Sequence, residues 1–398
     1  MDVSYEYDQF DASVERVFHI EDKTLGTSRK NFIVRYRGHL LGEDSVAAYD
    51  QLAADLKPLG VMPLFRVEEG RQVVFVIPGL PEPRRSNPYV NLILFVITIL
   101  SVMAAGALYG LEELPQPGVM SYLKVFISRG WPFAVSMIAI LGTHEFGHYL
   151  AGRRHGVHVT LPYFIPLPLS PFGTMGAFIN MKEPPKNKRD LLDIGIAGPL
   201  SGLVVSIVVL LIGLSLSELE EMPVALSEGV SYSLEGNSLL YLFLKLVSFG
   251  KLIPAPANYG GTSPVLYWLR YFFTGQPFPF GGVDVMLHPV AWAGWAGILV
   301  TSLNLIPAGQ LDGGHMVYVL LGKERARKLW PVVMVFLMLM GTVWSGWWLW
   351  AGLIFLLGRT YAEPLDQITE LDPPRRALAV LAFVVFLVTF TPVPLAFF

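Results

Sequence analysis

The chain has 398 residues, of which 53% are hydrophobic and only 15% are charged. Because soluble domains carry about 25% charged residues, this composition argues against an ordinary soluble protein and indicates a membrane protein. The absence of cysteine excludes disulfides, thiolate chemistry and cysteine-ligated zinc, and the net charge of −3 gives no indication of nucleic-acid binding.

Residues 1–87 are predicted to form a soluble N-terminal module and its linker. Alternating apolar residues predict three strands, and a helix that ends at Pro58 is expected between the first and the second. In chain order, the strand, the helix and the two further strands are Asn31–Arg37, Glu43–Lys57, Met62–Val67 and Gln72–Ile77. The module is therefore a small βαββ unit. The acidic, polar residues Met1–Phe10 do not resemble a cleavable signal peptide.

Residues 88–398 are predicted to form a membrane domain, because a helix needs about 20 apolar residues to cross roughly 30 Å of hydrocarbon. The predicted spans are 89–110, 131–152, 191–215, 289–308, 330–343 with 345–358, and 377–396. The paired segments are either a tight hairpin or one long tilted helix, and Leu239–Phe249 is too short to span. The expected fold class is an α-helical polytopic membrane protein with about six to eight membrane helices and a small α+β module.

Basic residues fall on one side of these spans if the N-terminus is cytosolic. They are Arg84, Arg85, Arg153, Arg154, Lys182, Lys186, Lys188, Arg189, Lys323, Arg325, Arg327, Lys328, Arg359, Arg375 and Arg376. This pattern requires two crossings between residues 330 and 358, so it favours the hairpin. It predicts a multi-pass protein of a bacterial-type inner or plasma membrane, with the N-terminus in the cytosol.

The segment His144-Glu145-Phe146-Gly147-His148 lies inside the second predicted span. Ionisable side chains at membrane depth are rare and usually functional. On a helix, His144 and His148 lie at i and i+4 on one face and can share a metal ion, while Glu145 is placed to polarise a metal-bound water. Counting helical rise from Arg153 places the two histidines roughly 8–14 Å inside the cytosolic boundary.

Two histidines leave a tetrahedral zinc one protein ligand short, with the fourth position kept for water or substrate. The best candidate is Asp312, at the cytosolic end of an apolar span and therefore at a depth like that of His148. Pro307 should break the preceding helix and free backbone groups, which is tolerated where backbone lines a cavity. The prediction is one zinc per chain, although Asp312 could instead be a helix cap or a turn residue.

These motifs resemble the site-2 proteases, which are intramembrane zinc metalloproteases. The matching residues are the His144–His148 pentapeptide and Asn304-Leu305-Ile306-Pro307 followed by Leu311-Asp312-Gly313. The resemblance implies that His144, His148 and Asp312 hold zinc, that Glu145 is the general base and that Asn304 contacts substrate. It covers roughly residues 89–360, with the core motifs within 131–322. With a soluble N-terminal module and no recognisable PDZ insertion, the chain is most similar to the chloroplast and cyanobacterial-type branch.

Two glycine-containing segments add to the resemblance. The segment Gly173-Thr174-Met175-Gly176-Ala177 looks like the re-entrant β-hairpin of that family, and a strand edge near zinc would bind an extended substrate by β-addition. An ordinary turn is the alternative. Gly198 and Gly202 look like the start of the third core helix, where they let helices pack closely. The implied activity is hydrolysis of peptide bonds within or next to transmembrane segments of substrate proteins, in contact with the lipid bilayer.

Three other functions stay open. A different membrane zincin would take a glutamate as third ligand, for which Glu363 is the weak candidate. A transporter or ion-binding protein could use the His/Glu cluster as a relay. Independently of that alternative, Asn304 could hydrogen-bond a neighbouring helix instead of contacting substrate. A silent scaffold of protease ancestry predicts loss of His144, Glu145, His148 or Asp312, and all four are present. Four other histidines are expected to lie at an interface or to serve packing: His155, His158, His288 and His315. Glu183 is expected to be a loop charge and Asp193 a helix-start residue.

Overall fold

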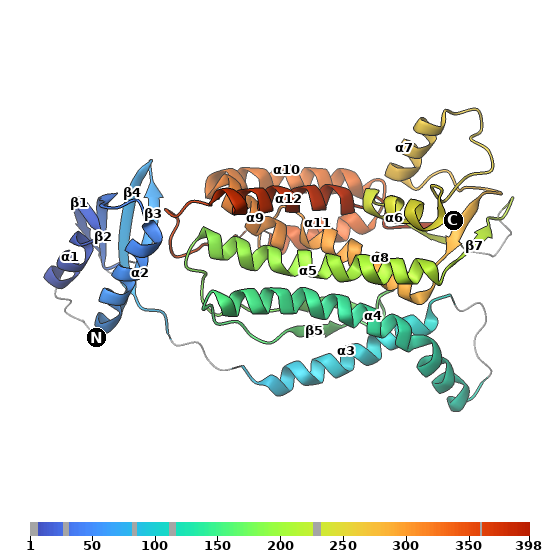
Figure 1. Cartoon of the computed structure of the whole chain (residues 1–398), viewed down its shortest axis with the longest axis horizontal. Helices are drawn as coiled ribbons and strands as arrows, with labels where there is room; N and C mark the ends of the chain where they lie inside the picture. Colours follow the sequence, from blue (N-terminus) through green and yellow to red (C-terminus); the bar gives the residue numbers. More distant parts are fainter. Residues whose placement is uncertain (1–6, 27–31, 82–85, 111–116, 226–231, 359) are drawn as a thin grey trace.

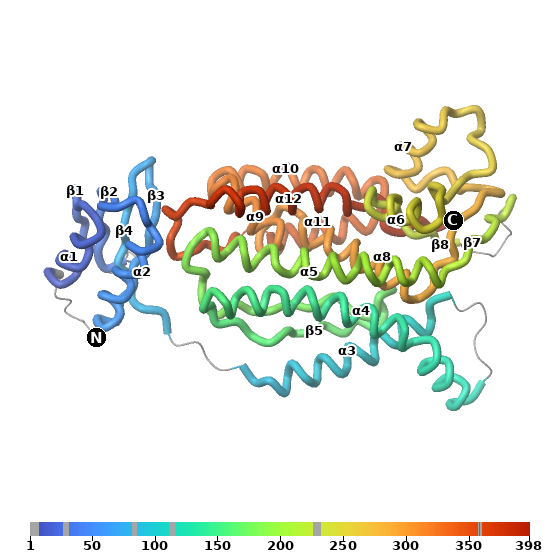
Figure 2. The backbone as a smooth tube through the Cα atoms, in the orientation of Figure 1, coloured from blue at the N-terminus to red at the C-terminus, as the bar shows by residue number. Residues whose placement is uncertain are grey.

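The computed structural model describes residues 7–26, 32–81, 86–110, 117–225, 232–358 and 360–398. A small sheet-containing module lies at one end, and a long bundle of helices extends from it to the opposite end (Figure 1). The C-terminus lies at the end of the bundle far from the module, where strand β10 (Leu395–Phe397) pairs with β8 (Ser233–Glu235) (Figure 2). Arg84, Arg85 and Arg359, which were part of the charge argument, lie outside the described residues.

The N-terminal module is a four-stranded antiparallel sheet with two helices. Its elements are α1 (Tyr7–Glu15), β1 (Phe18–Leu25), β2 (Val34–Leu40), α2 (Ser45–Leu56), β3 (Val61–Glu68) and β4 (Arg71–Pro78), with strand order β1-β2-β4-β3. The Asp44 side chain accepts hydrogen bonds from the backbone N–H groups of Val46 and Ala47, which begins α2. A 3₁₀ turn containing Pro58 follows α2 and ends at Gly60, at a positive φ of 71°.

The predicted strand, helix and two strands of the module correspond to β2, α2, β3 and β4, whereas α1 and β1 were missed. The βαββ description is therefore incomplete. In β1 only Phe18 is fully buried, and most of the other side chains are exposed. Its sequence consequently lacks the strict alternation by which a half-buried strand is recognised.

The helical bundle begins with three long apolar helices. They are α3 (Pro88–Leu108), α4 (Val119–Arg154) and α5 (Lys188–Ser215), and among the described residues these three are long and apolar enough to cross a membrane by length and composition. The remaining helices of the bundle are α8 (Pro289–Asn304), α9 (Asp312–Leu321), α10 (Lys323–Gly341), α11 (Gly346–Leu357) and α12 (Pro373–Thr389). The number of six to eight membrane helices stays a prediction.

Two details of the bundle refine the predicted spans. Helices α10 and α11 are separate and joined by a short turn, as the hairpin interpretation requires. Helix α4 begins 12 residues before the expected start at residue 131 and keeps Pro132 inside it. A Cβ atom built on Gly130 would lie 2.4 Å from the Met103 carbonyl oxygen, so this glycine permits the close contact of α3 and α4.

A short hairpin lies between α3 and α4 (Figure 1). Strand β5 (Tyr163–Pro166) pairs antiparallel with β6 (Thr174–Phe178), and a further bridge joins Val159 to Met181. The predicted hairpin is therefore present at the expected glycine-containing segment. At the far end of the bundle lie β7 (Glu218–Glu221), β8, α6 (Leu239–Phe249), α7 (Pro264–Thr274) and β9 (Val283–Met286).

Residues 364–369, here called the docking segment, join the module to the bundle. The Phe65 N–H of edge strand β3 donates to the Leu365 carbonyl, and the Gln367 N–H donates to the Phe65 carbonyl, both at 3.0 Å. On its other side, the docking segment bonds to Pro185 and Lys186, just before α5. The sheet of the module thus continues through two linkers of the bundle, which lie beside β3 (Figure 1).

Candidate metal centre

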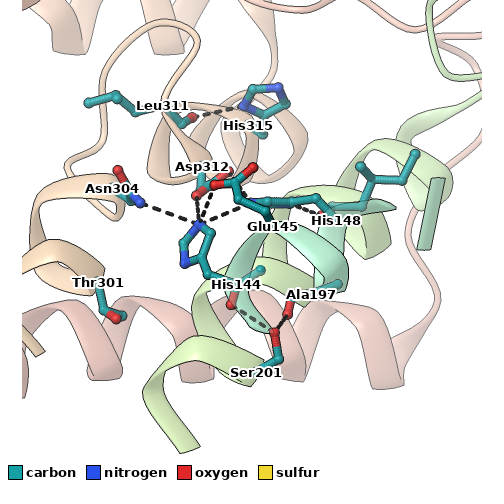
Figure 3. A network of polar contacts seen from close by, with 12 residues as sticks. His144, Glu145, His148, Ala197, Ser201, Thr301, Asn304, Leu311, Asp312 and His315 are labelled. Carbon is teal, nitrogen blue, oxygen red and sulfur yellow. Dashed lines mark hydrogen bonds and ion pairs between the residues drawn. The ribbon is translucent and has the colours of Figure 1, made fainter. Parts of the chain in front are cut away.

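Helix α4 and the start of α9 bring three metal-ligating side chains together (Figure 3). His144 and His148 are both buried, and their Nε2 atoms are 3.2 Å apart. Asp312 places Oδ2 3.5 Å from His144 Nε2 and Oδ1 3.4 Å from His148 Nε2. Within the described part of the chain, these residues form the one cluster of three or more His, Asp or Glu side chains with ligand atoms close enough for a metal ion.

The chain reaches Asp312 by folding back tightly after α8. This helix ends at Asn304, three residues before Pro307, as the predicted break requires. Gly313 and Gly314 then pass against backbone, since Cβ atoms there would lie 2.1 Å from the Leu305 oxygen and 2.2 Å from the Gly309 oxygen. Only residues without a side chain fit at this crossing, so the glycines set where the Asp312 carboxylate lies.

Helix α5 supports both histidines. The Nδ1 of His148 lies 2.7 Å from the Ile194 carbonyl oxygen, which selects the tautomer that leaves Nε2 free for a metal. A Cβ atom on Gly198 would lie only 2.1 Å from His148 Nε2, and one on Gly202 would lie 3.0 Å from His144 Cβ. The expectation that these glycines permit close packing is confirmed, and the group packed against them is the pair of histidines.

The geometry of this cluster fits zinc. Zinc bonds to histidine nitrogen and carboxylate oxygen are about 2.0–2.2 Å long, so two ligand atoms of a tetrahedral site are about 3.3–3.6 Å apart. The three separations between the ligand atoms of His144, His148 and Asp312 are 3.2, 3.4 and 3.5 Å. Two neutral imidazoles and one carboxylate also match the ligands of catalytic zinc sites, which keep a fourth position open.

Glu145 and Asn304 lie at the edge of this cluster (Figure 3). Glu145 is buried with Oε1 4.0 Å from His144 Nε2, and its Oε2 has no hydrogen-bond partner among the described residues. Strand β6 packs against α4, the helix that carries Glu145. The Asn304 amide nitrogen lies 3.3 Å from His144 Nε2. The site therefore contains a free, buried carboxylate oxygen and a polar amide beside the ligand set.

The other candidate residues lie elsewhere. Glu363 is paired with Lys323 at 2.6 Å, so it does not join the histidines as a third ligand. His315 is buried and bonds to the Leu311 carbonyl, and His288 accepts a hydrogen bond from the Val290 N–H at the start of α8. These two histidines therefore serve packing and helix capping, while the more exposed His158 pairs with Glu183 at 2.8 Å.

A network at the end of α4 was not predicted. His155 lies 3.0 Å from Asp190 and 3.1 Å from Asp193, and Arg375 of α12 pairs with Asp193 at 2.7 Å. The carboxylates of Asp190 and Asp193 raise the pKa of His155 to about 9. The network ties α4, α5 and α12 together, so Asp193 is more than a helix-start residue. The i, i+3 spacing of the two aspartates was the available sequence signal.

A second unpredicted cluster lies at the far end of the bundle, around the fully buried Lys245 of α6. Its Nζ lies 4.3 Å above the ring of Tyr241, whose hydroxyl donates to Glu235 at 2.7 Å. Burial, together with the nearby charge of Asp284, raises the pKa of Glu235 to about 7. Burial also lowers the pKa of Lys245. The short helix α6 thus carries a buried ionisable side chain rather than a uniformly apolar surface.

Comparison with known proteins gives the family. Residues 132–341 match the model of peptidase family M50. The chain is 29% identical over 331 residues to the probable zinc metalloprotease EGY1, chloroplastic, of Arabidopsis thaliana, covering 79% of this chain and 55% of that protein. It is 30% identical over 273 residues to the probable zinc metalloprotease EGY2, chloroplastic, of the same plant, covering 68% of this chain and 43% of that protein.

The chain spans about half the length of the curated relatives it matches. No solved structure matches it. The family match includes the pentapeptide of α4, the hairpin, the glycines of α5 and Asp312, and it agrees with the resemblance to site-2 proteases of the chloroplast type. The chain belongs to peptidase family M50.

Proposed function

We propose that this chain is a zinc-dependent endopeptidase that hydrolyses peptide bonds within or next to the transmembrane segments of other membrane proteins. The observation that carries this proposal is the buried triangle of His144, His148 and Asp312, with the separations of a tetrahedral zinc site beside the free oxygen of Glu145. The similarity to probable zinc metalloproteases supports the same reaction.

His144, His148 and Asp312 would hold one zinc ion per chain. When bound, zinc supplies a Lewis acid for the scissile carbonyl and lowers the pKa of a water molecule toward about 7. Glu145 then serves as the general base, because its unpartnered Oε2 is free to take a proton from that water. The same carboxyl group returns a proton to the leaving amide nitrogen, which completes hydrolysis.

The β6 strand offers a place for an extended substrate. It pairs only with β5 among the described strands, and a Cβ atom built on Gly176 would meet nothing within 4 Å. Met175 is 58% exposed on the same strand. A substrate pairing along Gly173–Ala177 would replace the helical hydrogen bonds that it loses on unwinding. Since a bound metal would occupy the lone pair of His144 Nε2, the Asn304 amide would be free to bond the substrate.

We also propose that the N-terminal module lies on the cytosolic side, or on the equivalent side of an organelle membrane. Arg153 and Arg154 end α4, and Lys186 and Lys188 precede or begin α5, at the end of the bundle next to the module (Figure 1). Basic residues flank membrane helices on that side. The bacterial-type inner membrane stays a prediction, because the named relatives are chloroplastic.

The test is Glu145→Gln in the purified full chain, reconstituted with a fluorogenic reporter peptide. The reporter has about 20 apolar residues and a central Asn-Pro pair that weakens its helix. The wild type should cleave the reporter and contain one zinc per chain. The variant should keep its zinc and lose at least about 100-fold in rate, which is typical of a lost general base.

Two further variants sharpen this test. Asp312→Ala should lower the zinc content, whereas Glu370→Gln, a matched change at a side chain that is 77% exposed, should alter neither zinc nor cleavage. Cleavage that survives in Glu145→Gln would contradict the assigned base. Unchanged zinc in Asp312→Ala would remove that residue from the metal site.

A further inference from the structure

Helix α3 carries a buried polar stripe that the proposed reaction does not use directly. Its outer face is apolar and exposed at Leu92, Ile93, Val96, Ile97 and Leu100. Asn91, Thr98 and Ser101 lie instead on the buried face. Polar side chains in membrane helices usually face the interior of the bundle and bond to a partner there. Among the described residues the Thr98 hydroxyl has no hydrogen-bond partner, so the contacts of Asn91 and Ser101 indicate what α3 does.

Asn91 holds the chain that enters the hairpin. Its Nδ2 donates to the carbonyl oxygens of Leu161 and Pro162, at 2.9 Å in both cases. These carbonyls lie in irregular backbone just before β5, where no strand pairing is present to satisfy them. Because non-helical backbone at membrane depth needs internal partners, one side-chain amide satisfies both groups and fixes the start of the hairpin.

Ser101 holds the chain at the other end of the hairpin, ten residues further along α3. Its hydroxyl donates to the Gly173 carbonyl at 2.5 Å. Gly173 has a φ of +70°, and a Cβ atom there would lie 2.4 Å from the Ser101 carbonyl oxygen. The backbone that leads into β6 is therefore in direct contact with the backbone of α3. Between the two anchors, the rings of Phe95 and Phe164 meet edge to face with centroids 5.0 Å apart.

The anchored hairpin reaches the candidate active site through β6, which packs against α4, the helix that carries Glu145. We propose that Asn91 and Ser101 are positioning residues, which hold the β5–β6 hairpin at both ends so that β6 keeps its place against α4. This inference rests on the proposed function. Helix α3 lies before residues 132–341, which match the family, so membership of that family does not assign it this role.

The physical consequence is a pre-ordered strand edge. A substrate that pairs with an already ordered edge does not have to order it, whereas ordering one backbone residue costs about 1–2 kcal/mol. Loosening the hairpin therefore weakens substrate binding while it leaves the zinc ligands of α4 and α9 in place. Variants at the two anchors should raise KM and change kcat little, because the lost interaction is made equally in the bound and transition states.

The test compares Asn91→Leu and Ser101→Ala with Leu92→Ala and Leu100→Ala, which alter the exposed face of the same helix. Ser101→Ala removes a single hydroxyl, so it serves if Asn91→Leu does not fold, and Ser101→Thr keeps the hydroxyl as a rescue. Each full-length protein is assayed for zinc content, for amide hydrogen exchange over residues 161–179, and for KM and kcat with the reporter peptide described above.

We expect both anchor variants to keep their zinc, to exchange hairpin amides at least tenfold faster and to raise KM at least fivefold with kcat within twofold. The exposed-face controls and Ser101→Thr should match the wild type. Unchanged exchange over residues 161–179 would overturn the proposal, as would faster exchange with unchanged KM. If the wild type fails to cleave the reporter, the proposed function and the positioning role are both wrong. The exchange data then still test the α3 contacts on their own, because faster exchange in the anchor variants does not depend on cleavage.

Discussion

Replacing Gly198 by alanine should remove the metal without removing the fold. The new Cβ atom would lie 2.1 Å from His148 Nε2 and 2.4 Å from its Cδ2, whereas unbonded heavy atoms pack at about 3.5 Å. The imidazole must therefore move by roughly 1.4 Å. Metal–ligand distances tolerate about 0.2 Å, so His148 can no longer share an ion with His144 and Asp312.

The expected loss is large enough to measure directly. Even support residues around a metal site change affinity by about 10–100-fold, so a displaced ligand should weaken zinc at least about 100-fold, equivalent to about 2.7 kcal/mol. The assay is competition for zinc between the detergent-solubilised protein and a chelating dye, with circular dichroism to follow helicity. Gly142→Ala, on the same helix as His148, is the matched control because its Cβ atom would meet nothing within 4 Å.

The alternative response to the Gly198 substitution is separation of α4 and α5, which would keep zinc and lower stability by about 1–3 kcal/mol, as in an overpacked core. That result would show that the helix contact yields more easily than the histidine. Zinc affinity and thermal stability both equal to those of the wild type would refute the reasoning, because the close approach of Gly198 to His148 would then not exist.

Two further predictions concern pH. Protonated His155 should stabilise the fold by up to about 3 kcal/mol below pH 6.5, and this contribution should be lost as pH rises through its folded pKa of about 9. Thermal unfolding of the wild type from pH 6.5 to 9.5 should show this loss of stability. The stability of His155→Gln should change less over the same pH range. Lys245→Met should destabilise the chain above pH 7, where Glu235 ionises without the nearby Lys245 amine, and much less at pH 5, where the raised pKa of Glu235 keeps it protonated. Equal destabilisation by Lys245→Met at both pH values would contradict this account.

The parts of the site that were predictable are encoded over short distances. The spacing of His144 and His148 places both on one face wherever α4 is helical, and the hairpin follows from a glycine-containing segment flanked by strand-like residues. The role of Asp312 could not be predicted from local spacing, since 168 residues separate it from His144. Its depth at the end of a span made it a candidate, and the resemblance of the combined motifs to a known family selected it.

The parts that were missed depend on contacts between distant segments. The bonds of His155 with Asp190 and Asp193 depend on how the end of α4 packs beside the start of α5, which no local pattern reports. The burial of Lys245 is similarly set by the strands and helices around α6. Strand β1 was missed for the opposite reason, because it is too exposed to show a pattern. Asn91 and Ser101 of α3 can be recognised in the sequence as polar residues in an apolar span, but the carbonyl groups that they bond cannot.

The docking segment makes the order of synthesis important for this protein. Arg66 of β3 donates to the Leu365 carbonyl across 299 residues of sequence, so the edge strand of the module has no partner on its outer side until those residues have been synthesised. At about 5–20 residues per second, that interval is roughly 15–60 s. An unpaired edge strand is a template for pairing with other chains. Nascent chains stopped before residue 364 would therefore expose a strand edge that the finished protein conceals.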